Sequence, residues 1–172
     1  FHRRQEMIEF GAKLAEQAKQ HADRVILYQT WPAPKDKTVT SPDLMAGIND
    51  AYIALAAKTG ASVSPAGVAF ELAKQRDPQI GPVIHYGKTD HHPSRIGSYL
   101  IACVHFATIY GKSPVGLPAT LYRSEGDRKR NRPHVTMDEK TARLLQECAW
   151  DAVQKMRKLE NQTTTGWTSV KP

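Results

Sequence analysis

The sequence predicts an α/β fold in which helices alternate with parallel strands. A length of 172 residues and a hydrophobic content of 40% fit one domain with a buried core. Several segments carry apolar residues at helical spacing, and short runs of β-forming residues lie between them. The order helix, strand, helix, strand, helix is typical of a parallel sheet covered by helices.

The first predicted elements are a helix over residues 3–22 and a buried strand over residues 24–29. The helix is amphipathic, with apolar residues at helical spacing: Met7, Phe10, Leu14 and Ala18. The strand is short, apolar and rich in β-forming residues, which favours a parallel strand. The prolines after Trp31 predict a loop.

A second helix and a second strand follow. Ser41 and Pro42 form an N-cap with proline at the first helical position, and Gly60 ends the helix. Residues 61–64 predict a short strand, and residues 68–75 predict a helix with Leu72 on its inner face. Two strands are too few for an independently stable sheet, so the chain is expected to be the C-terminal part of an α/β fold.

The second half is predicted as loops and two helices. Residues 77–93 are loop-like, with a strand remnant at residues 82–86. A helix over residues 94–111 has a strong apolar stripe and ends at Gly111: Ile96, Leu100, Cys103, Val104, Ala107 and Tyr110. A basic polar loop covers residues 113–133. Thr136 and Glu139 then form a capping box for a last helix, and a frayed tail starts at Gln162.

Composition restricts the partners and the compartment. No apolar run approaches the ~18 residues that a membrane span needs, and no signal segment opens the chain. Much of the excess of basic residues behind the net charge of +7 is local, in residues 123–132, which we interpret as a solvated loop because the segment is polar and lacks apolar periodicity. No aromatic residues are interleaved there, as a stacking surface for nucleic acid would need. Nucleic-acid binding is therefore only a third hypothesis, and no nucleic-acid partner is expected. Cys103 and Cys148 each lie on the apolar stripe of a predicted helix. The sequence does not decide whether they form a disulfide.

The chemistry is expected in the loop that contains Asp90, His91 and His92. An imidazole can take the proton of a serine nucleophile while a carboxylate orients its ring. The alternative is a polar helix-entry loop in which Asp90 and Ser94 are local caps, and a metal site that adds His85 is a further alternative. We nevertheless expect no metal and no cofactor.

The same loop and its surroundings resemble the C-terminal block of the SGNH (GDSL-type) hydrolase superfamily, in particular a bacterial branch of esterases. The matching segments, densest between Asp90 and Pro114, are residues 90–94, 97–100, 102–103, 110–114, 25–31, 65–69, 145–146 and 149–150. The resemblance implies a three-layer α/β/α flavodoxin-like fold over residues 1–160, without its N-terminal strands, and a flexible tail over residues 161–172. It also implies a small-molecule or glycan ester substrate and a periplasmic or secreted location.

The resemblance implies a serine ester hydrolase, a carbohydrate acetylesterase being one form, with His92 as general base and Asp90 as its orienting acid. The family pattern places that acid at the position of Thr89. The nucleophilic serine and the oxyanion donors are expected upstream of Phe1. Trp31, at the end of a predicted strand, and Tyr86 are candidate substrate-binding residues. The alternative is a non-catalytic carbohydrate- or partner-binding protein that keeps the fold.

Overall fold

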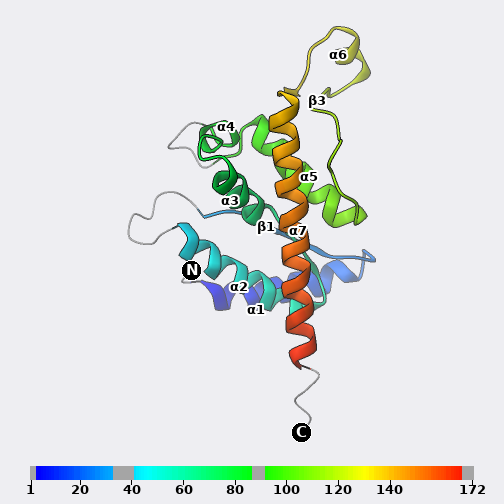
Figure 1. Ribbon diagram of the computed structural model, residues 1–172. Helices are drawn as coiled ribbons and strands as arrows, with labels where there is room; N and C mark the ends of the chain where they lie inside the picture. Colours follow the sequence, from blue (N-terminus) through cyan, green and yellow to red (C-terminus); the bar gives the residue numbers. More distant parts are fainter. Residues whose placement is uncertain (1–2, 33–40, 87–91, 168–172) are drawn as a thin grey trace. The chain divides into compact units, whose positions relative to one another are not determined.

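The computed structural model describes residues 3–32, 41–86 and 92–167, and its ribbon is shown in Figure 1. The described residues form a mixed α/β structure that is mostly helical. They divide into two compact units, one made of residues up to Gly67 and from Val153 onward, the other of Val68–Ala152. Whether residues 1–160 form one larger domain with preceding chain stays a prediction.

The first unit contains a parallel pair of strands. Strand β1 (Ile26–Gln29) pairs with β2 (Ser62–Pro65), with Ile26 opposite Ser62 and Gln29 opposite Pro65. This pairing confirms the predicted α/β class and both predicted strands. In the part of the chain that the structure describes, no other strands pair in parallel, so the three-layer flavodoxin-like sheet stays a prediction.

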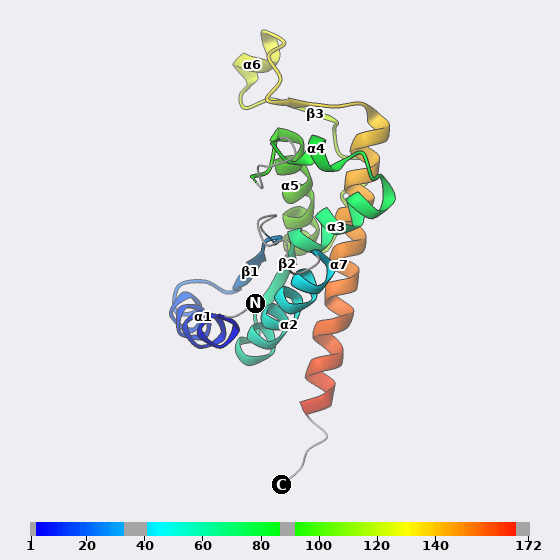
Figure 2. The same cartoon turned by 90° about the vertical axis from the view of Figure 1, so that its left-hand side faces the viewer.

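Two helices accompany this pair and pack against each other, α1 (Arg4–Lys19) and α2 (Ser41–Thr59) (Figure 2). They approach closely because Gly11 faces Leu55, and a Cβ at Gly11 would lie 2.8 Å from the Leu55 Cδ2 atom. The apolar stripe predicted for α1 is wrong in part: Phe10 is 56% exposed and Leu14 is 66% exposed. The buried residues of α1 are small, Ala12 and Ala15, because small side chains allow α1 and α2 to approach closely.

The second unit is built on helices. Helix α3 (Ala66–Arg76) follows β2, and α4 (Gly81–Ile84) is a short helix. The strand remnant predicted over residues 82–86 is therefore wrong for residues 82–84, whereas His85 forms an isolated antiparallel bridge. Helix α5 (Arg95–Tyr110) follows the predicted pattern, ending at Gly111 with a left-handed φ of 67°. Its stripe is buried at Leu100, Cys103, Val104 and Ala107, whereas Tyr110 is exposed.

The basic segment predicted as a loop carries short regular elements. Strand β3 (Thr120–Leu121) pairs antiparallel with β4 (Val135–Thr136), and α6 (Glu125–Lys129) lies between them. Because Thr136 belongs to β4 and its hydroxyl bonds that of Thr120, it does not cap the last helix. The predicted capping box is therefore wrong.

The last helix, α7 (Glu139–Trp167), is the orange to red helix of Figure 1 and contributes to both units. Its start is capped by Asp138, whose carboxylate accepts the backbone N–H of Thr141 at 2.8 Å. This hydrogen bond and that from the Thr141 hydroxyl hold the pKa of Asp138 below its usual value. The helix continues to Trp167, through the first residues of the segment where we expected a tail.

Candidate functional site

The backbone around His92 is held between α4 and α5 in the second unit. The Tyr86 N–H donates to the His92 carbonyl at 3.1 Å, and the Ser94 N–H donates to the Ile84 carbonyl at 2.9 Å. These two hydrogen bonds make a short antiparallel bridge between His85 and Pro93. Residues 92–94 thus lie against the end of α4 before α5 begins, and His92 has a defined backbone position.

Ser94 secures the end of this segment. Its Oγ donates to the Val83 carbonyl at 2.5 Å and accepts the Gly97 N–H at 3.1 Å, the second bond being an N-cap of α5. This confirms the predicted role of Ser94 as a cap. A hydroxyl engaged on both sides in this way serves the fold, and we do not assign it as a nucleophile.

The start of α5 is seated tightly on the end of α4. A Cβ added at Gly97 would lie 2.0 Å from the Ile84 carbonyl oxygen and 3.2 Å from the Phe70 Cζ atom. His85 packs beside the same Phe70, with ring centroids 5.0 Å apart. The site segment therefore rests on a packed base formed by α3, α4 and α5.

His92 and Tyr86 are brought together by this frame, and both are exposed. Tyr86 is 57% exposed, so its ring is accessible from solvent. An exposed imidazole is accessible to a second side chain or a substrate, and a general base must lie within hydrogen-bond reach of the proton that it abstracts. The role of His92 as general base stays a prediction.

The predicted acid, Asp90, lies outside the described residues, as do Thr89 and His91. Its role as the orienting carboxylate therefore stays a prediction. Among the described residues, no three histidine, cysteine or acidic side chains gather so as to hold a metal ion. The alternative in which Asp90, His91 and His92 bind a metal together with His85 stays a prediction, because Asp90 and His91 lie outside the described residues.

Trp31 belongs to the first unit, two residues after β1, where it is half-buried. The neighbouring Gln29 is fully buried and donates its side-chain amide to the Asn49 Oδ1 atom at 2.8 Å. Gly67 closes against the same edge, since a Cβ there would lie 2.2 Å from the Thr30 carbonyl oxygen. Trp31 therefore follows the carboxyl ends of the parallel strands, the edge at which such folds bind ligands.

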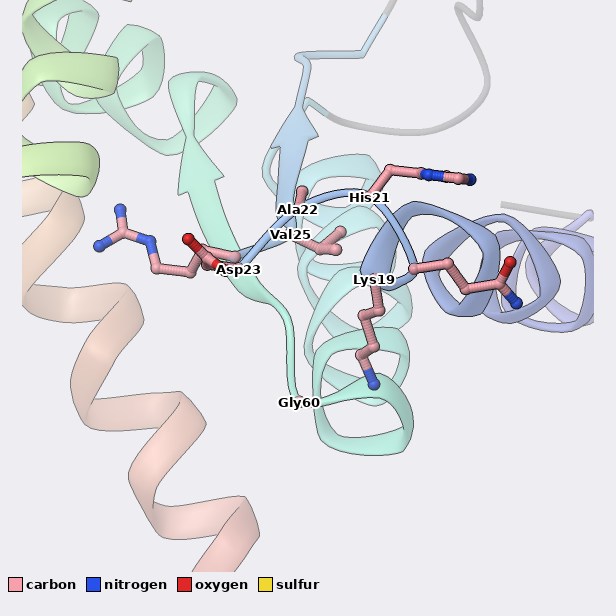
Figure 3. Close-up of a pocket in the computed structure, with 8 residues that line it drawn as sticks. Lys19, His21, Ala22, Asp23, Val25 and Gly60 are labelled. Carbon is pink, nitrogen blue, oxygen red and sulfur yellow. The ribbon is translucent and has the colours of Figure 1, made fainter.

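A surface pocket of about 560 Å³ lies at the opposite edge of the same sheet. It is lined by the turn that precedes β1 and by Gly60, which precedes β2. The side chains of Lys19, His21 and Asp23 point in different directions and do not converge (Figure 3). Because it lies at the amino ends of the strands and lacks convergent groups, we do not assign it as the functional site.

A second concavity, of about 170 Å³, lies in the second unit, and no sequence pattern predicts it. Arg95 from α5 lines it together with Arg123, Asp127, Arg132, Pro133 and His134. The composition of the segment that contains Arg123 and Arg132 predicts only a solvated loop, and no pattern assigns a role to His134. The charge run was visible, but no local pattern could show that Arg95 joins it.

A search among models of known families, curated proteins and solved structures finds no match to this chain. In the part of the chain that the structure describes, no helix is both long and apolar enough to cross a lipid bilayer.

Proposed function

We propose that this chain supplies the general base of a serine ester hydrolase, and that the base is His92. The observation that carries the proposal is the position of His92, exposed and held by backbone hydrogen bonds directly before α5. Its neighbours Pro93 and Ser94 complete the bridge and the cap that fix this segment. The sequence resemblance described above supports the same role.

In the proposed reaction a serine Oγ attacks the carbonyl carbon of an ester while His92 accepts the hydroxyl proton. The tetrahedral intermediate then collapses, and His92 returns the proton to the leaving alcohol oxygen. Water repeats the sequence on the acyl-enzyme and releases the acid. Because Ser94 is engaged as a cap, the proposal takes the serine and the oxyanion donors from residues that precede Phe1. Asp90 would orient the imidazole, and the proposed substrate is an acetyl ester on a carbohydrate.

The test is p-nitrophenyl acetate hydrolysis by the protein that includes the residues preceding Phe1. Replacing His92 by Ala is expected to lower kcat/KM about 10²–10⁴-fold, because proton transfer in the transition state is lost. His21→Ala, an exposed histidine after α1, is the matched control and should leave the rate unchanged. Hydrolysis that survives His92→Ala at the full rate would refute the assignment.

The acid is tested with a second pair of variants. Asp90→Asn should lower kcat and leave KM nearly unchanged, because the imidazole is then no longer held in its productive tautomer. Thr89→Val is the matched control, at the position where the family pattern has the acid. A loss in Thr89→Val that equals the loss in Asp90→Asn would contradict the role of Asp90.

Threonine at position 89 favours one second candidate function, a carbohydrate-binding protein without catalysis. That candidate predicts binding of an acetylated oligosaccharide in isothermal titration together with no ester hydrolysis by the unaltered protein. Turnover that His92→Ala abolishes would exclude it.

A further inference from the structure

The concavity missed by the sequence analysis gathers positive charge from three separate segments. We call it the arginine pocket, and its cationic members are Arg95, Arg123 and Arg132. Arg95 comes from the first residue of α5, Arg123 follows β3, and Arg132 precedes β4. Tertiary structure therefore brings together groups that are up to 37 positions apart in the sequence (132 − 95).

His134 orients two of these arginines. The Arg123 Nε–H donates to the His134 Nδ1 atom at 2.9 Å, and the Arg95 Nη1 donates to the His134 carbonyl oxygen at 3.4 Å. His134 is itself held by its backbone N–H, which donates to the Leu121 carbonyl at 2.8 Å. Two guanidinium groups are thus positioned before any ligand arrives, which reduces the entropy that binding costs.

Among the described residues, neighbouring carboxylates do not balance the positive charge of the arginine pocket. In the part of the chain that the structure describes, Asp127 is the one carboxylate that lines the pocket, and it already accepts from the Ser124 hydroxyl at 3.0 Å and pairs with Arg130 at 3.5 Å. Within the described residues, Arg95, Arg123 and Arg132 form no ion pair with a carboxylate. Guanidinium groups stay charged at all working pH values, so a bound anion would relieve their mutual repulsion.

We propose that the arginine pocket binds a tetrahedral oxyanion, the sulfate or phosphate ester group of a small ligand or glycan. Three donor groups from three segments suit an anion with several oxygens better than a planar carboxylate, which one guanidinium fork already satisfies. A volume of about 170 Å³ has room for one such group and does not form an extended track. A nucleic acid would need a continuous basic path or aromatic stacking surfaces.

The experiment follows backbone and arginine Nε–H resonances of the full chain during titration with sodium sulfate, sodium phosphate or sodium acetate. Sodium chloride at matched ionic strength is the reference. Saturable shifts at Arg95, Arg123, Arg132 and His134 are expected with sulfate or phosphate in the millimolar range, with weaker binding of acetate. Comparison of the sulfate and phosphate arms identifies the favoured ester.

Arg123→Gln and Arg132→Gln should each weaken binding about tenfold, because each removes a charge-assisted hydrogen bond. Arg143→Gln removes an exposed arginine of α7 that pairs with Glu147, and it should bind like the unaltered chain. Shifts that do not saturate, or that chloride reproduces, would overturn the proposal. Tighter binding of duplex DNA with equal losses in Arg128→Gln and Arg132→Gln would also overturn it, in favour of a nucleic-acid surface. None of these readouts depends on ester hydrolysis.

Discussion

At the scale of single residues, the backbone position of the candidate site depends on Gly97, which has no side chain. The first turn of α5 approaches the Ile84 carbonyl so closely that no Cβ fits between them. The same turn carries the Ser94 cap, and His92 lies just before it. The position of the proposed base therefore follows from a contact between backbones.

Gly97→Ala is expected to destabilise the protein although alanine favours helices. Alanine gains about 1 kcal/mol of helix propensity, but a Cβ 2.0 Å from a carbonyl oxygen forces a shift whose cost, about 1–3 kcal/mol for overpacking, exceeds it. Gly81→Ala in α4 is the control, because its Cβ would meet no atom within 4 Å. Urea unfolding should show a loss in the first variant and none in the second; equal stability of the two would contradict the close contact.

Both cysteines should be unreactive in the folded protein. Cys103 and Cys148 are free thiols, buried in α5 and α7, and burial raises the pKa of each to about 11. The thiolate that reacts with a disulfide reagent is therefore scarce at about pH 8. Ellman's reagent should react with neither thiol until guanidinium chloride unfolds the chain. Rapid labelling of the native protein would show that the thiols are accessible.

At the scale of elements, the C-terminal part of α7 supports the edge of β2. The Glu160 carboxylate accepts the Val63 N–H at 2.7 Å, a donor of the strand edge. Burial raises the pKa of Glu160 above its usual value, while this hydrogen bond and Arg157 act in the opposite direction. Ionisation of the half-buried Glu160 carboxyl therefore lowers the stability of the folded protein.

The sign of this effect gives a pH-dependent prediction. Since the folded-state pKa of Glu160 is raised, its stabilising contribution is complete below the unfolded-state pKa and declines as pH rises through the folded-state value. Glu160→Gln keeps an acceptor for Val63 but does not ionise. The free energy of unfolding of this variant minus that of the unaltered chain should therefore be larger at about pH 7 than at about pH 4, which means that the variant gains relative stability as pH rises. Urea titrations at both values test this, and a difference that is independent of pH would contradict it.

At the scale of the whole molecule, one helix provides core residues for both compact units. Leu145 of α7 is buried in the second unit, and Met156 of the same helix is buried in the first. A long amphipathic helix thus has the same packing role in two parts of the chain.

Leu145→Ala and Met156→Ala should therefore each lower the free energy of unfolding by about 2–5 kcal/mol, the usual cost of truncating a large buried side chain. Arg143→Ala, exposed on α7, should change it by no more than about 0.5 kcal/mol. Denaturant unfolding followed by circular dichroism measures all three. A small effect of either core variant would show that its unit does not depend on α7.

The sequence alone determined those features that depend on neighbouring residues. The cap at Ser94, the apolar stripe of α5 and its end at Gly111 are local patterns, and the structure has the cap, the end and the stripe except for the exposed Tyr110. The exposed position of His92 also agrees with its polar loop. Local signals suffice for such features because a cap, a stripe and a turn each involve residues only a few positions apart.

Tertiary structure decided which surfaces meet. It exposed Phe10 and Leu14 because α2 packs on the small residues of α1, and it made residues 81–84 helical against α5. It also joined Arg95 to His134, a pair 39 positions apart in the sequence (134 − 95). Such pairings depend on the free energy of packing over the whole chain, which no local periodicity contains.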